Sequence, residues 1–278
     1  MPGPPIRRRQ LGAALRQMRL DAGQTREQVA AVLGCSPTKV TYMEAGRNAP
    51  SKTDLIVLLD HYGASDRLVT LEGLRAEAGK RGWWSTARLP EWLATYTALE
   101  NEAASVRCFE LELIPGLLQH ADYAHAVHTL RGYANPEDLA RRVDARLRRQ
   151  QRLTGPDPLE LSAVISQAAL TRTAADPQVA AASLAHLLAA AGLENVDIRI
   201  LPFAAGLHSG LQGAFTLLSF PQGLLPDAAW QEYALGGHVI DDTADVAALA
   251  RLYGEIRSQA LGCDESLAMI ADLAASTR

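Results

Sequence analysis

The segment from Gln24 to Ser51, QTREQVAAVLGCSPTKVTYMEAGRNAPS, constrains the fold most because it holds two helix starts and two glycine stops in one short stretch. Gln28 follows Thr25 at the spacing of a capping box. Ser36 is a good N-cap, and Pro37 after it suits the first helical position, where no N–H is needed. The segment therefore predicts two short consecutive helices, each ended by a glycine.

Three further helices are expected around this pair. An apolar stripe at helical spacing predicts one helix ending near Gly23, and Ser51 and Ser65 are candidate N-caps for two more. Two short helices joined by about three residues around Gly34 form a helix-turn-helix, whose second helix enters the DNA major groove. The N-terminal region is therefore predicted to be an all-α five-helix domain.

The third helix has a surface suited to a polyanion. Once Val40 and Met43 face inward, its other side chains are short polar groups, one lysine and one tyrosine, with no carboxylate before Glu44. Acids would be repelled by phosphates, and Arg26 and Arg47 lie at helix ends where phosphates can dock. A five-helix bundle that does not bind DNA is the alternative.

Residues 10 to 63 resemble the Cro/repressor (XRE-type) helix-turn-helix family, on the spacing of TREQVAAVLGCSPTKVTYMEAGRNAPS. The resemblance implies a domain that reads operators as a dimer. It implies the following base-facing residues: Pro37, Thr38, Thr41 and Tyr42. It implies phosphate contacts from Ser36, Lys39 and Arg47. It also pairs Arg19 with Glu44 to brace the first helix against the third. At the family's usual phosphate-binding glutamine this chain has Arg26, so a charged group would make that contact.

The composition changes beyond residue 80. Residues 80–96 contain three of the four tryptophans, including Trp83 and Trp84, and are predicted to be an aromatic linker between a domain at 1–79 and one at 97–278. Packing between domains is favoured for these rings over nucleotide stacking. Residues 1–80 contain 12 Lys and Arg against 8 Asp and Glu, whereas residues 81–278 contain 15 against 23. A basic head on an acidic body is expected if only the head meets a polyanion, although uneven surface charge without a partner would look the same.

Residues 97–278 mix helical and strand patterns without a regular alternation, which predicts an α+β domain. The expected helices cover about 90–105, a segment after Pro115-Gly116, 136–153, 177–191, 243–261 and 264–275. The expected strands cover 106–114, 159–166, 196–203, 213–220 and 230–241, the last folding back through Gly236-Gly237. The arginines of RRVDARLRRQQR are interpreted as a solvated helix face rather than a second nucleic-acid surface.

Signs of catalysis or of a bound metal or cofactor are weak. His120, His125 and His128 have no accompanying cysteine or His-Glu-x-x-His pattern, and the glycine-rich GLHSGLQG matches no phosphate-binding motif. We therefore expect no enzyme, no catalytic residue, no metal site and no cofactor. The loop at His208, Ser209 and Gly210 is the candidate contact for a small ligand or protein partner. The three cysteines have no pairing pattern, and are expected to be small buried residues.

Residues 97 to 273 resemble the C-terminal domain of unknown function found after an XRE helix-turn-helix in actinobacterial regulators, some of them antitoxin-like. The likeness rests on four segments: ALENEAASVRCFELELIPGLLQHADYAHAV, RLRRQQRL, IRILPFAAGLHSGLQGAFTLLSF and DDTADVAALARLYGEIRSQAL. It implies a transcriptional regulator, often encoded beside a small partner protein.

We therefore expect a DNA-binding regulator that forms a homodimer on a near-palindromic operator in double-stranded DNA, its C-terminal domain binding a partner protein or a small-molecule effector. An antitoxin-like protein that sequesters a small partner and autoregulates its operon is the alternative, and an enzyme is the third. No apolar run is long enough for a membrane helix, so a cytoplasmic, nucleoid-associated location without membrane contact is expected.

Overall fold

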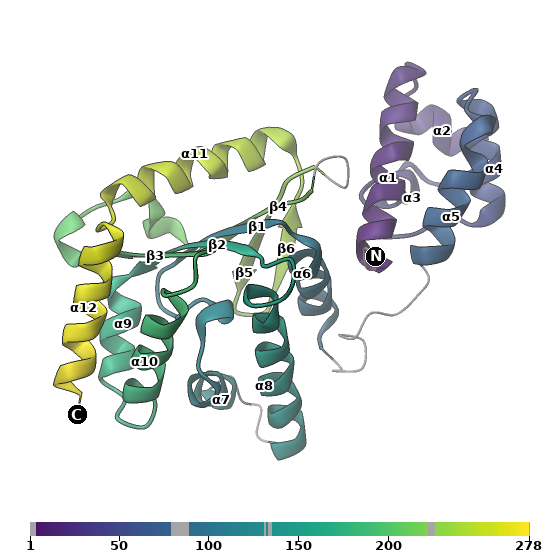
Figure 1. Cartoon of the computed structure of the whole chain (residues 1–278). Coiled ribbons are helices and arrows are strands. Elements are labelled where there is room, and N and C mark those ends of the chain that lie inside the picture. Colours follow the sequence, from purple (N-terminus) through teal and green to yellow (C-terminus); the bar gives the residue numbers. More distant parts are fainter. Residues whose placement is uncertain (1–3, 79–88, 131, 133–134, 222–225, 278) are drawn as a thin grey trace. The chain divides into compact units, whose positions relative to one another are not determined.

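The computed structural model describes residues 4–78, 89–130, 132, 135–221 and 226–277. The chain divides into two compact units, an N-terminal helical unit and a larger unit that contains the sheet. The N-terminal unit has five α-helices among its described residues (Figure 1). They are α1 (Pro4–Asp21), α2 (Arg26–Val32), α3 (Pro37–Glu44), α4 (Lys52–His61) and α5 (Leu68–Ala78).

The helix starts of this unit follow the predicted caps. Thr25 and Gln28 form a reciprocal capping box at α2. Ser36 caps α3 by accepting a hydrogen bond from the Lys39 N–H, and Ser51 caps α4. The start predicted at Ser65 is a 3₁₀ turn, so α5 itself begins three residues later. Because each cap satisfies N–H groups that the helix cannot, the caps fix where these short helices begin.

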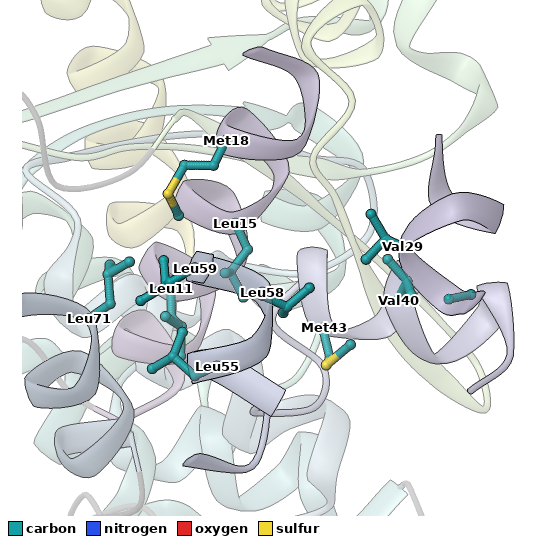
Figure 2. Close-up of a cluster of buried hydrophobic side chains, with 11 residues drawn as sticks. Leu11, Leu15, Met18, Val29, Val40, Met43, Leu55, Leu58, Leu59 and Leu71 are labelled. Atoms are coloured by element: carbon teal, nitrogen blue, oxygen red, sulfur yellow. The ribbon is translucent and has the colours of Figure 1, made fainter. Parts of the chain in front are cut away.

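A single apolar cluster holds the five helices together (Figure 2). Every helix of the unit contributes to it, including the predicted stripe of α1. Its members are Leu11, Leu15, Met18, Val29, Ala30, Val40, Met43, Leu55, Leu58, Leu59 and Leu71. Burying these side chains is the main stabilisation of helices as short as α2 and α3, which would not persist alone in water.

The second unit contains a six-stranded mixed sheet in the order β3-β2-β1-β4-β5-β6. β1 pairs in parallel with β2 and β2 with β3, whereas β4, β5 and β6 continue the sheet antiparallel. The strands are β1 (Ser105–Glu110), β2 (Glu160–Ser166), β3 (Val196–Leu201), β4 (Phe215–Ser219), β5 (Ala228–Tyr233) and β6 (Gly236–Ile240). The second unit is therefore an α+β domain, as predicted.

Helices cover both faces of this sheet. Figure 1 shows α11 crossing one face, and α7 to α10 on the other. The helices are α6 (Glu91–Glu102), α7 (Ala121–Leu130), α8 (Pro136–Gln150), α9 (Gln167–Ala174), α10 (Ala180–Ala190), α11 (Thr243–Gln259) and α12 (Cys263–Ser276). On the α11 face, Phe109 is fully buried and packs in one cluster with Phe215, Tyr253 and Ile256.

Several expected boundaries were wrong. The strand predicted to reach Ile114 ends at Glu110, and a 3₁₀ turn at Gly116–Leu118 follows in place of a simple Pro-Gly turn. Helix α9 was not predicted. The β5–β6 hairpin exists, but Tyr233 pairs with Gly236, so Ala234 and Leu235 form its turn. Gly237 is needed for packing instead, because a Cβ there would lie 2.8 Å from Cη2 of Trp230 and still nearer to Cζ2.

The arginine cluster of α8 is not simply a solvated face. Arg148 is exposed, but Arg149 is buried and forms two hydrogen bonds with buried Glu100 of α6, at 2.6 and 2.7 Å. The Arg149 guanidinium also lies 5.1 Å from the ring centre of Tyr96. A buried charge needs such compensation, and this ion pair attaches α8 to α6.

Much of the predicted aromatic linker, including Trp83 and Trp84, lies outside the described residues. Trp92, at its end, belongs to α6 and stacks on Trp230 of β5 with ring centres 6.1 Å apart. This ring therefore packs within the second unit. In the part of the chain that the structure describes, no helix combines the length and apolar character needed to cross a membrane.

Candidate DNA-binding surface

Helix α3 divides into an inward and an outward face. Val40 and Met43 are each 2 % exposed and lie in the apolar cluster (Figure 2). Pro37 and Thr38 are exposed. Tyr42 is 39 % exposed. Since α3 begins directly after its Ser36 cap, Pro37 and Thr38 lie in its first turn. In helix-turn-helix proteins the N-terminal residues of the second helix contact the base edges.

Two of the predicted base-facing residues have internal interactions. The Thr41 hydroxyl donates a hydrogen bond to the Pro37 carbonyl at 3.1 Å, and Thr41 is half-buried. The Arg47 guanidinium lies over the Tyr42 ring, 5.4 Å from its centre. The base-facing set is thus not equally accessible, and Thr38 and Tyr42 expose the most side chain with hydrogen-bonding capacity.

The predicted phosphate contacts also have partners within the protein. Ser36 accepts the Lys39 N–H at 3.3 Å, which leaves its hydroxyl proton able to donate to a phosphate. The Lys39 Nζ lies 3.2 Å from Oδ2 of Asp54 on α4, and the Arg26 Nε lies 3.1 Å from Oε2 of Glu44. A phosphate that binds Lys39 or Arg26 must therefore compete with a carboxylate of the protein. Sequence reasoning did not predict either pair.

Glu44 at the end of α3 forms ion pairs with two arginines, Arg19 and Arg26. Its carboxylate accepts hydrogen bonds from Arg19 of α1 at 2.5 and 3.1 Å, with side-chain exposures of 7 % and 5 %. This hydrogen bonding raises the pKa of Arg19 above its ordinary value. Burial and the negative charge of Glu44 raise the pKa of Tyr62 to about 12. The Arg19–Glu44 pair connects α1 directly to the helix that carries the predicted base-facing residues.

Two glycines allow the backbones of this pair of helices to approach closely. A Cβ on Gly12 of α1 would lie 2.5 Å from the carbonyl oxygens of Met43 and Glu44. Gly46 follows α3 with a φ of 67°, and a Cβ there would lie 2.7 Å from the Arg9 Cα. The glycine predicted as a helix stop therefore also makes the α1–α3 contact possible.

The candidate ligand loop lies in the second unit and is partly a packing element. A Cβ on Gly210 would lie 2.8 Å from Cζ of Phe109 and 2.9 Å from Cδ1 of Ile256. His208 packs edge-on against Phe109, and the Ser209 hydroxyl lies 3.4 Å from the carboxylate of Glu255. The requirement for glycine at position 210 thus comes from the core. A role of this loop in binding stays a prediction.

Comparison with known proteins yields two family matches. A model described as a helix-turn-helix domain matches residues 10–71, and a model described as a domain of unknown function, DUF5753, matches residues 93–272. No curated protein and no solved structure matches the chain.

These matches agree with the geometry. The N-terminal unit is a helix-turn-helix domain, the class of fold that places a helix in the DNA major groove. The second match covers more than half of the chain, and the chain therefore belongs to the DUF5753 family.

Proposed function

We propose that this protein is a sequence-specific transcriptional regulator that binds a near-palindromic operator as a homodimer. The observation that carries the proposal is the outward face of α3, whose exposed groups are Ser36, Pro37, Thr38, Lys39 and Tyr42, with Arg47 just beyond. This face offers hydrogen-bond donors and positive charge, and its helix ends with its carboxylate turned inward. In a dimer the two α3 helices would lie about 34 Å apart, one turn of DNA.

The proposal includes the finer assignments made from the sequence. The N-terminal unit is XRE-type, its host is an actinobacterium, and the protein acts at the nucleoid. The DUF5753 domain carries the dimer contacts and receives a partner protein or a small ligand. It catalyses no reaction. Control follows if that partner or ligand favours one arrangement of the two reading domains, since a ligand shifts an equilibrium only by its differential affinity.

An antitoxin-like role, in which the second unit sequesters a small protein, is the second candidate. The segment after β3 favours it, because three large apolar side chains are exposed there: Phe203 at 60 %, Leu207 at 92 % and Leu211 at 52 %. Exposed apolar residues gathered in one segment are typical of protein contacts. Co-purification of one small, stoichiometric protein that is lost on replacing Leu207 and Leu211 by serine would support this role.

The proposal is tested first by immunoprecipitation of the tagged protein with sequencing of the bound DNA. Recovered sites are then measured by fluorescence anisotropy over a range of salt concentrations. For the Lys39→Ala, Arg47→Ala double variant we expect affinity to fall for all sequences, and the slope of log K against log salt to flatten by about 0.9 per lost phosphate contact.

Matched variants separate base contacts from phosphate contacts. Thr38→Ala and Tyr42→Phe should change which site is preferred and leave the salt slope unchanged, because they remove neutral donors. Arg67→Ala, an exposed arginine outside α2 and α3, is the control and should do neither. The proposal fails if no site is enriched, or if the Lys39/Arg47 variant binds recovered sites like the original protein.

A further inference from the structure

A cavity of about 280 Å³ lies within the second unit, apart from the loop at 208–210. It is lined by α6, α7 and α8, by the end of β1 and the segment that follows it, and by the adjoining ends of β4 and β5. A site at the carboxyl end of a strand, where the chain leaves the sheet, is a common location for ligands in proteins with parallel strands. Its lining combines aromatic side chains with two polar groups that have no direct partner among the described residues.

The first of these polar groups is Gln119, which is 3 % exposed and lines the cavity. Its Nε2 donates to the Ile114 carbonyl at 2.7 Å, and this bond fixes the orientation of the amide. Its Oε1 is buried and has no hydrogen-bond partner among the described residues. A buried acceptor without a partner lowers the stability of the fold. This oxygen can therefore accept a hydrogen bond from a molecule bound in the cavity.

The second polar group is Arg146, one turn before Arg149 on α8. Arg149 is neutralised by Glu100, but Arg146 has no hydrogen-bond or ion-pair partner within the described part of the chain. Burial and the neighbouring Arg149 lower the pKa of Arg146 to about 10, while the negative charges of Glu232 and Glu100 act to raise it. Its Nη1 lies so close to Gly116 that no Cβ would fit there. The guanidinium is thus held at the cavity without a carboxylate in direct contact.

The remaining lining restricts the anion that would fit. Tyr96 and Trp230, with ring centres 5.1 Å apart, form an aromatic wall. Glu110, Glu112 and Glu232 also line the cavity, and the two exposed ones, Glu112 and Glu232, lie where it opens to solvent. Glu112 is paired with Arg172 at 2.7 Å. The carboxylates disfavour a doubly charged phosphate more than a singly charged carboxylate, and they would attract an ammonium group. The cavity therefore suits one carboxylate inside, a donor beside it and a flat apolar body.

We propose that this cavity binds a small aromatic carboxylate that carries an adjacent hydrogen-bond donor, the chemistry of an aromatic amino acid. Arg146 takes the carboxylate, Gln119 Oε1 accepts the ligand's N–H, and the ring lies against Trp230 and Tyr96. This assignment deepens the proposed function by naming the effector class, and its regulatory consequence rests on that function. The same chemistry is presented by a free amino acid and by the C-terminal residue of a peptide.

The test is isothermal titration of the full chain without DNA. L-tryptophan is the probe, L-tryptophanamide and indole lack the carboxylate, and N-acetyl-L-tryptophan represents a peptide end. We expect L-tryptophan to bind. The amide and indole should bind at least about tenfold more weakly. Tight binding of the acetylated probe would identify a peptide end as the source, and weak binding a free amino acid. No binding of either carboxylate probe would overturn the proposal.

Variants then assign the site. Arg146→Met should weaken binding of L-tryptophan at least about tenfold, because it removes the charged hydrogen bonds and keeps only the unbranched apolar stem. The affinity of Arg146→Lys for L-tryptophan should lie between those of the original chain and Arg146→Met, because lysine keeps the charge but not the planar guanidinium. Arg148→Met, an exposed arginine on the same helix, should bind like the original chain. Equal affinity of the Arg146→Met and Arg148→Met variants, both shown to be folded by thermal denaturation, would also overturn the proposal.

Adding DNA separates this inference from the proposed function. Anisotropy on a recovered operator is repeated with saturating L-tryptophan, in the original chain and in Arg146→Met. A ligand effect on operator affinity that is absent in Arg146→Met supports both statements. Ligand binding in a chain that fails to enrich any DNA site keeps the cavity assignment and rejects the regulator. Operator binding without ligand binding keeps the regulator and rejects the cavity assignment.

Discussion

The Lys39 Nζ lies 3.2 Å from the Asp54 Oδ2, so the lysine expected to meet phosphate is held by an acid of the neighbouring helix α4. The same carboxylate belongs to the capping box of α4. Burial acts to raise the pKa of Asp54, but the hydrogen bonds from Lys39 and Ser51 lower it below its ordinary value. Asp54 therefore stays ionised beside the outward face of α3, and it would compete with a phosphate for Lys39.

Removing this competition should strengthen DNA binding. Exposed ion pairs contribute up to about 1 kcal/mol, so Asp54→Asn is expected to raise affinity about two- to fivefold for all sequences. The asparagine can still accept the Ser51 N–H, so α4 should keep its cap. Anisotropy measures the effect, and Asp60→Asn, an exposed acid at the other end of α4, is the control. Unchanged affinity in Asp54→Asn would show that Lys39 does not meet phosphate.

Glu44→Gln should destabilise the N-terminal unit. It leaves the buried Arg19 guanidinium without its charged partner, a loss expected to cost about 3 kcal/mol. The readout is hydrogen exchange of the α1 and α3 amides in the full chain. Glu72→Gln removes the partner of Arg75 in a pair whose side chains are 24 % and 28 % exposed, and should cost about 0.5 kcal/mol or less. Equal protection in the two variants would contradict a structural role for the Arg19–Glu44 pair.

The stability of the second unit should depend on pH through Asp197. Burial acts to raise the pKa of this carboxyl, but hydrogen bonds from Cys263, Arg257 and Ser162 lower it below its ordinary value. A carboxyl with a lower pKa in the folded state stabilises the fold at neutral pH. That stabilisation is lost as the pH falls through the folded-state value.

Asp197→Asn should therefore lower the free energy of unfolding by about 1 to 2 kcal/mol at pH 7, and by progressively less towards about pH 3. Urea titrations followed by tryptophan fluorescence measure both values. Asp272→Asn, an exposed acid of α12, is the control and should change stability by about 0.5 kcal/mol or less at either pH. A difference between Asp197→Asn and the original chain that stays constant with pH would exclude this linkage.

Two glycine-to-alanine substitutions should have opposite effects. Gly237→Ala places a methyl group against the Trp230 ring, and overpacking of this kind costs about 1 to 3 kcal/mol. Gly254 lies exposed within α11 with no atom near its Cβ position, so alanine there should stabilise by about 0.5 to 1 kcal/mol. Thermal denaturation compares them. Similar melting temperatures would mean that the hairpin relaxes away from the ring.

The N-terminal unit could be predicted closely because its signals are local. A serine or threonine cap acts on N–H groups two or three residues away, so the sequence spacing itself carries the information. The Glu100–Arg149 pair joins residues 49 positions apart, and nothing in the α8 sequence marks which arginine turns inward. The β5–β6 turn was misplaced because Gly236-Gly237 fits a tight turn by local preference, whereas the Trp230 ring needs Gly237 in the strand.

The DNA-facing surface was predicted as a set of residues but not as a set of interactions. Burial of Val40 and Met43 follows from helical spacing, and the residues between them are left for the outward face of α3, where Thr41 is only half exposed. The partners of Lys39 and Arg26 come from α4 and from the end of α3, and their geometry depends on how the helices pack. The cavity near Arg146 was not predicted, because its lining is drawn from six separate segments of the chain, including Leu93, Gln119 and Trp230.

The close approach at Gly12 and Gly46 limits how this chain can change in evolution. Any side chain at either position would push α1 away from α3, break the geometry of the Arg19–Glu44 pair and tilt the outward face of α3. In a saturation library selected for operator binding, these two positions would stay glycine even where Pro37, Thr38 and Tyr42 vary freely. New DNA specificities could then arise on the outward face of α3 while the close contact between α1 and α3 stays unchanged.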